Sequence, residues 1–330
     1  MNSLCRWKIS TKFFSMLALS LAMVSGASFA QTYPTRPIKI IVPFPAGGPT
    51  DAYARIVGQK LYEAWGQPVI IDNKAGATGL IGSNAVKDAA ADGYTLLFTS
   101  NSAHVIGPLL HKPNSFDPVT DLTPISMVLR YPMYFLVANK VPAKSLKEFV
   151  ALAKAKPGQM SYSSVGIGSG GHLACELINI AAGIEAIHVP YKGASPAQTA
   201  LAAGDVDYMC DSVGFSQPLV QAGKIRGLAI TAAKRSAAVP DVPTVAEQGI
   251  PSVEAYIWSG IFGPKGMPDA IRSKLNAEVM RIMNLPAVEG LVTKSGYEVM
   301  AGTSEQLIKD ITTEKVAWNK LITEKNIKAE

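Results

Sequence analysis

The chain has 330 residues, of which 48% are hydrophobic and 17% charged, and its formal net charge is +6 at pH 7. This length exceeds what one compact core usually holds, so it predicts two domains. Arg6, Lys8 and Lys12 lie in the first 30 residues, and removing that segment lowers the net charge from +6 to +3. A charge of this size gives no argument for a nucleic-acid-binding protein.

Residues 1–30 have the composition of a secretory signal peptide. Three basic residues precede an apolar run over residues 13–24, and the small residues Ser28 and Ala30 occupy the −3 and −1 positions of a cleavage site. The apolar run is too short to span a membrane, and no later stretch reaches 18 uninterrupted apolar residues. We therefore expect a secreted protein that is soluble after cleavage.

The stretch over residues 38–65 is the one around which the remaining chain is arranged. A β-branched strand at 38–42 leads into a Pro/Gly loop containing Gly47 and Gly48, and then into a helix that Thr50 or Asp51 is suited to cap. A loop that opens onto a helix N-terminus can bind an anion. The alternative is that this loop is a plain connection between a strand and a helix.

Further strands are expected at 69–71 and 94–98. After Thr99, four prolines interrupt the pattern before residue 125, which predicts an irregular surface excursion. A second series of strands and helices follows, with strands expected at 134–138, 160–164, 186–189, 206–210 and 227–231. Within it, Ser145 and Glu148 form a capping box, and Ser195 is expected to cap a helix with Gln198 reaching back.

A second irregular passage, with prolines at 240, 243 and 251, precedes the last elements. These are a strand at 260–262, a helix at 269–283, a strand at 298–300 and a C-terminal helix that Thr303 and Gln306 cap. The spacing of apolar residues predicts the inner face of that helix, which comprises Leu307, Ile311, Val316, Trp318 and Leu321.

The alternation of strands and helices predicts an α/β protein with a largely parallel sheet covered by helices on both faces. Because two irregular passages bracket the second series, the chain is expected to leave a first domain, build a second one and return. The predicted domains are residues 31–124 with 254–330, and residues 125–253. Two crossings between domains form a hinge.

Several kinds of chemistry find little support. Residues 166–171 match G-x-G-x-x-G, but the next strand lacks a terminal acidic residue for a ribose, which argues against a dinucleotide site. Ser169 does not lie in G-x-S-x-G, and no acidic residue is placed to orient His172. The histidines and cysteines lack metal-ligand spacing. We expect no cofactor, no metal and no enzymatic activity.

Cys175 and Cys210 are the cysteines that remain after residue 30. The helix bearing Cys175 and the strand ending at Cys210 are expected to be neighbours. Two alternatives stay open for them, a disulfide bond or two buried thiols.

Two glycine-rich loops, at residues 47–48 and 168–171, each present backbone N–H groups at a helix N-terminus, and neither loop contains Lys or Arg. Two such helix ends on facing domains suit a small molecule with one or two carboxylates. Domain closure would then enclose this ligand.

Six motifs in order along the chain resemble those of one family. They are YPTRPI (33–38), VPFPAGGPTD (42–51), DGYTLL (92–97), GSGGHL (168–173), HVPYKG (188–193) and VPT (242–244). The chain resembles the solute receptors of tripartite tricarboxylate transporters, the Bug-type periplasmic binding proteins. The resemblance implies a type II periplasmic-binding-protein fold, with two doubly wound α/β domains and the ligand between them. It also implies a periplasmic location and a membrane permease as partner.

The resemblance and the two loops together give a set of predicted ligand-binding residues, several of which have structural alternatives. Phe44 could instead cover the core edge, Asp51 could cap its own helix, and Tyr191 could pack rather than line the pocket. Trp258 is expected in the core. The predicted ligand-binding residues are Phe44, Ala46, Gly47, Asp51, Thr99, Asn101, Ser164, Gly168, Ser169, Gly170, His172, Tyr191 and Asp211.

The function expected from these observations is that of a monomeric periplasmic receptor. It would capture a small organic acid by domain closure and deliver it to the permease of a tripartite tricarboxylate transporter. An alternative is a ligand-sensing receptor for a membrane signalling protein, which also needs ligand-induced closure. Backbone donors alone do not identify the acid.

Overall fold

The computed structural model describes residues 33–111, 116–250, 253–300, 302–324 and 327–328. The predicted signal peptide, residues 1–30, lies outside the described residues. The chain divides into two compact units, Met1–Thr35 and Arg36–Glu330, and everything below concerns the second unit. No helix among its described residues is both long enough and apolar enough to cross a bilayer.

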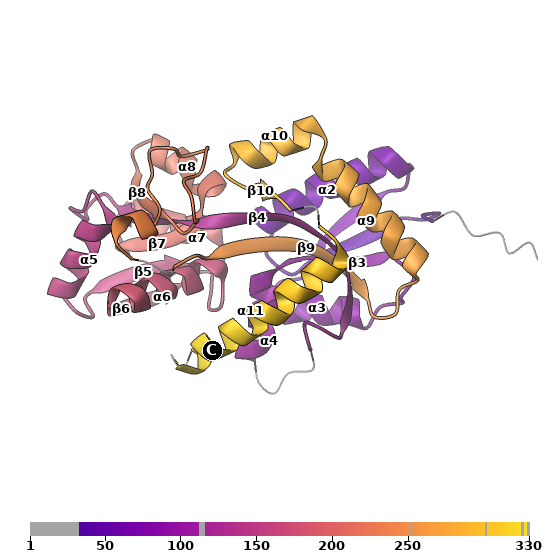
Figure 1. The fold of residues 1–330 in the computed structure, drawn as a ribbon, viewed down its shortest axis with the longest axis horizontal. Helices are drawn as coiled ribbons and strands as arrows, with labels where there is room; N and C mark the ends of the chain where they lie inside the picture. The colour runs from indigo at the N-terminus through magenta and orange to yellow at the C-terminus, as the bar shows by residue number, and fades with distance from the viewer. Residues whose placement is uncertain (1–32, 112–115, 251–252, 301, 325–326, 329–330) are drawn as a thin grey trace, which may run out of the picture. The chain divides into compact units, whose positions relative to one another are not determined.

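The strands of the described residues form one continuous sheet, in the order β2-β1-β3-β9-β4-β7-β5-β6, with β8 and β10 also paired to β4 (Figure 1). Their bounds are β1 Ile38–Val42, β2 Val69–Asn73, β3 Thr95–Ser100, β4 Leu122–Ala138, β5 Met160–Ser164, β6 Ala186–Pro190, β7 Tyr208–Ser212, β8 Ile225–Ile230, β9 Tyr256–Pro264 and β10 Glu298–Val299.

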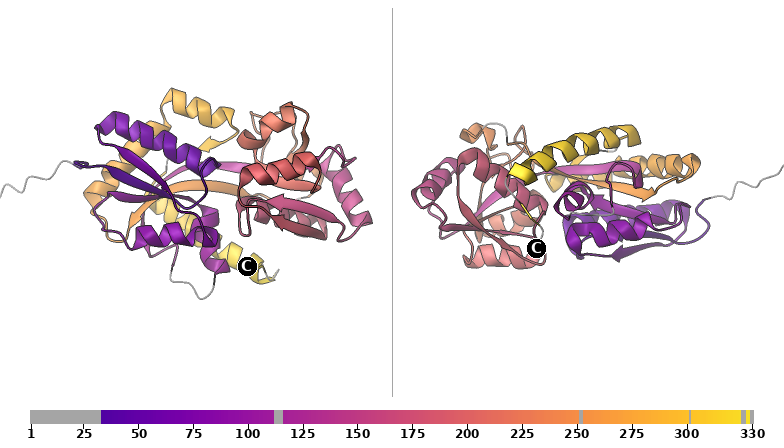
Figure 2. Two further views of the ribbon diagram at one scale, coloured as in Figure 1. Left: turned by 180° about the vertical axis from the view of Figure 1, so that it is seen from behind. Right: turned by 90° about the horizontal axis from the view of Figure 1, so that it is seen from below.

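The longest strand, β4, belongs to both halves of the sheet. Its first part pairs with β9, up to the register Pro132↔Tyr256, and its second part, from Met133, pairs with β7 and β8. We call the half with β1–β3, β9 and β10 the first lobe, and the half with β5–β8 the second lobe. Figures 1 and 2 show β4 and β9 running side by side between the lobes.

The sheet differs from the largely parallel one predicted. Among the strands of the described residues, parallel pairing is confined to β2-β1-β3 and β6-β5-β7, whereas β4 and β9 are antiparallel to the strands that they pair with. The expected strand at 134–138 is only the second part of β4. The long strands that cross between the lobes are antiparallel to the strands of the neighbouring βα units. Neither the periodicity nor the spacing of apolar residues in the sequence indicates the direction of a strand.

Helices cover both lobes (Figure 2). The helical segments are α2 Pro49–Trp65, η1 Ala77–Gly79, α3 Leu80–Lys87, η2 Ser102–Ile106, α4 Gly107–Leu110, α5 Leu146–Ala155, α6 Gly170–Ala182, α7 Ala194–Ala203, α8 Val213–Gln221, η3 Ala246–Gln248, α9 Asp269–Met283, α10 Pro286–Lys294 and α11 Ser304–Glu324. The predicted bounds of α9 are confirmed. Helices α8 and α10 were not predicted.

The first part of the passage after Thr99 is buried, which corrects the expectation of a surface excursion over residues 101–110, while residues 112–115 lie outside the described part of the chain. Residues 101–110 form the π-helical turn η2 and the short helix α4, and all of them are buried. His104 in η2 stacks on Phe262 of β9, with ring centroids 4.0 Å apart, and Trp258 lies in the same core as expected. Apolar residues between prolines therefore pack as core here, although the prolines break regular helix.

The inner face of α11 is confirmed in part. Leu307 and Ile311 are buried in the core of the first lobe, and Trp318 packs against it. The prediction that Val316 belongs to this inner face is wrong, because 70% of the surface of Val316 is exposed. Ile322 takes part instead, in a cluster with Ile106 and with Leu173 of the second lobe.

Candidate ligand-binding site

The N-termini of three helices, α2, α6 and α7, converge on one cavity of about 300 Å³, which we call the ligand pocket. Residues of both lobes line it. They are Phe44, Pro45, Ala46, Gly47, Gly48, Pro49, Thr50, Ser100, Ser102, Tyr131, Met133, Val165, Ser169, Gly170, Gly171, Lys192, Gly193, Ala194, Ser195, Pro196, Cys210, Asp211 and Ile257.

The α2 end of the pocket is arranged differently from the prediction. Gly48 is the N-cap residue and Pro49 occupies the first turn, so neither Thr50 nor Asp51 is the N-cap. Asp51 accepts the Gly47 N–H at 2.9 Å, which leaves that N–H unavailable to a ligand. The first turn of a helix has no internal acceptors for its N–H groups, so those of Thr50 and Asp51 are the donors that α2 offers.

Asp51 is tied to its surroundings. Its carboxylate accepts hydrogen bonds from Arg55 at 2.9 and 3.0 Å and from Asn73 at 2.9 Å. Burial acts to raise the pKa of Asp51, but the hydrogen bonds from Arg55, Gly47 and Asn73 outweigh it and hold the pKa below its usual value. Asp51 neither lines the pocket nor caps α2, so it has neither expected position; its bonds to Gly47 and Asn73 fix the loop before α2 instead.

At the α6 end, two glycines allow close approach. Ser169 is the N-cap residue, and its hydroxyl accepts the His172 N–H at 3.4 Å. A Cβ on Gly171 would lie 2.3 Å from the Cys210 carbonyl oxygen, and one on Gly170 would lie 2.3 Å from the Ile257 side chain. Only glycine fits at Gly171, because backbone is the obstacle there. The N–H groups of Gly170 and Gly171, in the first turn of α6, remain as donors.

The α7 end was not predicted as part of the site. Gly193, with φ 122°, is its N-cap residue, so the expected cap at Ser195 is wrong. Gln198 does not reach back to the helix start. It donates instead to Asp211 at 2.6 Å. Lys192 directly precedes this end and brings the single cationic side chain among the described pocket-lining residues.

Asp211 is the acidic residue of the pocket wall. It is 7% exposed and accepts hydrogen bonds from Gln198, from the Ser216 hydroxyl at 2.8 Å and from the Ser212 backbone at 2.8 Å. Burial raises the pKa of Asp211, while these three hydrogen bonds oppose the rise. The carboxyl group thus links β7, α7 and α8 at the pocket edge.

Two stacked histidines lie behind the α6 end. The rings of His172 and His188 are 4.0 Å apart, and burial lowers the pKa of His172 to about 3 and that of His188 to about 4. Nδ1 of His172 accepts the Gly168 N–H at 3.1 Å, and Nε2 of His188 lies 2.7 Å from the Ser164 hydroxyl. Both rings are neutral at pH 7 and hold the loop after β5 in place.

The predicted ligand-binding residues separate into two groups. Those that line the pocket are Phe44, Ala46, Gly47, Ser169, Gly170 and Asp211. Those that do not line it are Asp51, Thr99, Asn101, Ser164, Gly168, His172 and Tyr191.

The second group mostly supports the loops that carry the first. The Thr99 hydroxyl donates to the Ser100 carbonyl at 3.4 Å, and the Tyr191 N–H donates to the Ser164 carbonyl at 2.9 Å. Gly168 faces Leu110 of the first lobe, which a Cβ would meet at 2.3 Å. Asn101 is fully buried and turned toward β9.

Sequence reasoning also missed several pocket residues, including Lys192, Tyr131 and Ile257. Lys192 stands inside the HVPYKG motif, so the motif itself carried a signal for it. Tyr131 and Ile257 lie on β4 and β9 and reach the pocket only because those strands cross between the lobes.

Cys175 and Cys210 are neighbours, as expected. Both are buried and free, with their Sγ atoms 2.7 Å apart. Burial, together with the adjacent thiol, raises the pKa of Cys175 well above its usual value. The structure therefore holds two buried thiols beside the start of α6.

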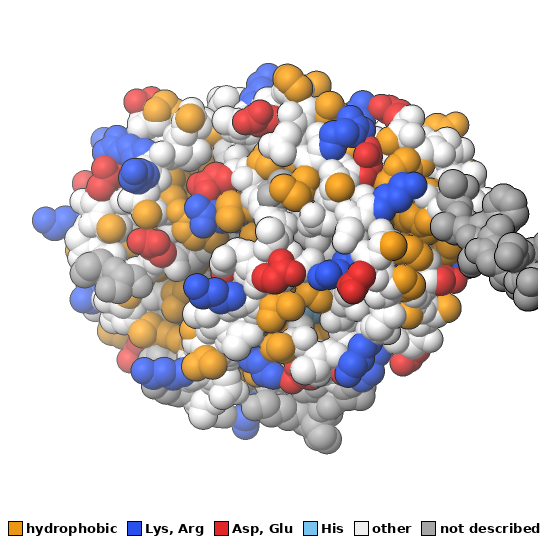
Figure 3. All heavy atoms as spheres, turned by 45° about the vertical axis from the view of Figure 1, so that its right-hand side comes forward, with side chains coloured by type: hydrophobic (Ala, Val, Ile, Leu, Met, Phe, Trp, Pro, Cys, Tyr) orange, Lys and Arg blue, Asp and Glu red, His pale blue; other side chains and the backbone are white. Residues whose placement is uncertain are grey.

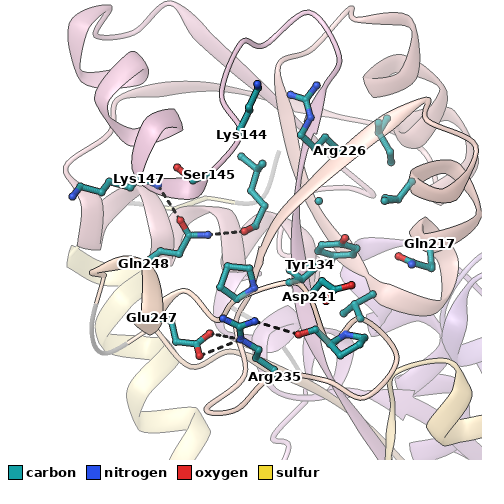
Figure 4. A pocket seen from close by; sticks show the side chains of 18 of the residues that line it. Tyr134, Lys144, Ser145, Lys147, Gln217, Arg226, Arg235, Asp241, Glu247 and Gln248 are labelled. Carbon is teal, nitrogen blue, oxygen red and sulfur yellow. Dashed lines mark hydrogen bonds and ion pairs between the residues drawn. The ribbon is translucent and has the colours of Figure 1, made fainter.

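A larger hollow lies on the second lobe (Figure 4). It measures about 1420 Å³, and Lys144 and Arg226 stand side by side at its rim. Helix α5 begins there, but its first N–H groups already have acceptors, since Glu148 donates to Ser145 and Leu146 donates to Gln248. The described start of α5 thus leaves no free N–H on Leu146, Lys147 or Glu148 for a ligand in this hollow.

The possible metal ligands and the surface charge of the described residues bear on what else the protein could bind. No group of His, Cys, Asp and Glu among the described residues is placed to hold a metal ion. On the face drawn in Figure 3, basic and acidic side chains are interspersed. The polar chemistry of the pocket consists of backbone N–H groups, hydroxyls, one lysine and one aspartate.

Comparisons with known proteins agree with this geometry. Residues 53–327 match the model of the tripartite tricarboxylate transporter family receptor. Protein BugT of Bordetella pertussis is 35% identical over 321 residues, which cover 96% of this chain and 98% of BugT.

Solved structures are similar across most of the chain. An R. palustris protein with adipate has a TM-score of 0.86 and 33% identity, covering 90% of this chain and all of that one. Periplasmic binding protein BugD has a TM-score of 0.83 and 31% identity with the same coverage. MatC from Rhodopseudomonas palustris with bound malate has a TM-score of 0.82 and 32% identity, covering 88% of this chain and all of MatC.

These similarities confirm the predicted α/β periplasmic-binding-protein fold with its two domains. They also agree with a pocket between two lobes that presents helix N-termini and hydroxyls. The chain belongs to the family of tripartite tricarboxylate transporter receptors.

Proposed function

We propose that this receptor binds a small organic acid in the ligand pocket, between its two lobes, and delivers it to the membrane permease of a tripartite tricarboxylate transporter. The observation that carries the proposal is the convergence of the N-termini of α2, α6 and α7 on one cavity. Adipate and malate, the acids held by two related structures, set the size class of the expected ligand.

Helix ends suit a carboxylate for two reasons. Each helix N-terminus attracts negative charge, and its unpaired N–H groups point at the anion; a helix end contributes on the order of 0.3–2 kcal/mol. The donors are backbone groups, so binding does not require long side chains to become ordered. Lys192 adds a positive charge at the α7 end.

The proposed domains are residues 31–124 with 254–330, and residues 125–253. The start of β9 at Tyr256 supports the second boundary, whereas the pairing of β4 with β9 as far as Pro132 favours a first crossing near residue 132 rather than residue 124. A ligand that touches both lobes favours the closed arrangement. We further propose that the protein acts as a monomer in the periplasm and releases its ligand chemically unchanged.

Thermal unfolding against a panel of solutes tests this function. The panel holds adipate, malate, aromatic acids, acidic amino acids, neutral sugars and cations. A cognate acid at about 100 times its dissociation constant adds roughly 2.7 kcal/mol to the free energy of unfolding. Stabilisation by neutral sugars or cations alone would contradict the proposal. Recovery of the stabilising acid unchanged after incubation separates a receptor from an enzyme.

A further inference from the structure

Asn101 lies between two pocket residues but faces away from the pocket. Ser100 and Ser102 line the pocket, whereas the Asn101 side chain is fully buried on the other side of the chain. Its Nδ2 donates to the Tyr256 carbonyl at 3.0 Å and to the Glu314 carboxylate at 3.3 Å. The position of this pocket wall therefore depends on partners outside the pocket.

Glu314 comes from the C-terminal helix α11, which packs against β4, η2 and α4. The second carboxylate oxygen of Glu314 accepts the indole N–H of Trp258 at 2.9 Å, and Trp318 adds a further side-chain hydrogen bond. One half-buried carboxylate thus joins α11, β9 and the segment between β3 and η2.

The surroundings of Glu314 contain charged groups of both signs. Lys309 and Asp310 of α11, Arg130 of β4, and Glu254 and Tyr256 at the entry to β9 line the same hollow as Glu314. Arg130 is paired with Glu298 at 2.7 Å. Burial raises the pKa of Glu314 to about 7, with a smaller rise from Asp310, although Asn101 and Trp258 donate hydrogen bonds to it. The group therefore changes its charge near neutral pH.

We propose that Glu314 is a positioning residue of the ligand pocket, whose ionised carboxylate holds Asn101 and, through the backbone, keeps Ser100 and Ser102 in place for the ligand. This inference rests on the proposed function of the pocket. Protonating Glu314, or replacing it, weakens ligand binding without removing any group that touches the ligand.

The chemistry of the two states explains the effect. An ionised carboxylate accepts hydrogen bonds at both oxygens, which matches the N–H donors Asn101, Trp258 and Trp318. A proton on either carboxylate oxygen points toward an N–H donor, so the hydrogen bond from that donor is weakened or lost. If the Asn101 amide turns over, its Oδ1, which has no hydrogen-bond partner among the described residues, accepts the new O–H, but Nδ2 then leaves the Tyr256 carbonyl. Either response moves Asn101.

The first test needs no ligand. The chain after residue 30 has three tryptophans, Trp65, Trp258 and Trp318. In an NMR pH titration, the indole signals of Trp258 and Trp318 and the backbone amides of Ser100 and Ser102 shift together with a midpoint near pH 7, and the indole of Trp65 on α2 does not. The shifts vanish in Glu314→Gln. Ser100 and Ser102 amides that do not follow the indoles would overturn the inference.

The second test measures affinity, with adipate and malate as probes at pH 6 to 8. The wild-type protein binds the better probe at least about fivefold more tightly at pH 8 than at pH 6. A fivefold change in affinity is at the lower end of what coupling between two sites usually produces. Glu314→Gln binds at every pH as weakly as the wild type does at pH 6. The control Glu305→Gln, which changes an exposed carboxylate in the first turn of the same helix, keeps the wild-type rise. A rise that persists in Glu314→Gln would overturn the inference.

A second variant guards against misfolding. Trp258→Phe keeps an aromatic ring in the core but removes one donor to the charged carboxylate, so the midpoint moves to higher pH. An unmoved midpoint counts against the inference. If neither probe binds, the proposed function fails for these acids, while the ligand-free titration still decides the role of Glu314.

Discussion

At the scale of single residues, the pocket presents fewer free donors than its glycines suggest. The Gly47 N–H donates to the Asp51 carboxylate, and the Gly168 N–H donates to Nδ1 of His172. These bonds fix the loops, so that the first-turn N–H groups of the helices remain for the ligand. The glycine motifs could be recognised from sequence, but the pairing of each N–H depends on side chains that fold back onto it.

Lys192 is the residue through which charge complementarity can be tested. Lys192→Met should weaken binding of adipate or malate about two- to fivefold, which is what an exposed ion pair contributes. Isothermal titration calorimetry at low and high salt checks this result, because screening reduces the contribution of an exposed charge. Lys234→Met, an exposed lysine of the same lobe outside the pocket, serves as the control. Equal losses in both variants would contradict a local role.

At the scale of elements, the start of α6 is fixed by contact with β7. Gly171→Ala places a methyl group 2.3 Å from the Cys210 carbonyl oxygen, so α6 must shift. We expect a loss of about 1–3 kcal/mol in the free energy of unfolding, as for overpacked sites. Because the shift also moves the N–H donors of α6, binding of the best acid should weaken at least about tenfold.

The matched control is another helical glycine. A Cβ on Gly290 of α10 meets nothing within 4 Å, so Gly290→Ala should keep the affinity and should not lower the unfolding free energy. Denaturant unfolding and calorimetry measure both quantities. A Gly171→Ala protein as stable and as tight-binding as wild type would show that the contact does not fix the helix.

Elements with local signals could be predicted, and those set by distant contacts could not. The Ser145 cap of α5 is confirmed, with the Glu148 N–H donated to its hydroxyl at 3.1 Å. The N-cap residues of α2 and α7 are glycines instead, while Asp51 bonds to Asn73 of β2 and Gln198 bonds to Asp211 of β7. Asn101 faces Glu314, 213 residues later in the chain, so no local pattern indicated its direction.

At the scale of the whole second unit, the order of strands and helices predicted the α/β class and the return of the chain to the first lobe. The direction of the crossing strands could not be predicted, since β4 reads as a short strand at 134–138 in the sequence but continues from Leu122. This crossing brings Tyr131 and Ile257 to the pocket floor. The pocket is therefore a property of the topology as much as of the two glycine loops.

The central claim is that converging helix N-termini bind a carboxylate. The measurement that tests it most directly is a crystal structure of the protein with the acid that stabilises it best. We predict carboxylate oxygens within about 3.2 Å of first-turn N–H groups of α6 and of α2 or α7. An acid seated in the hollow beside Lys144 and Arg226, or one whose carboxylates touch none of these helix ends, would contradict the claim.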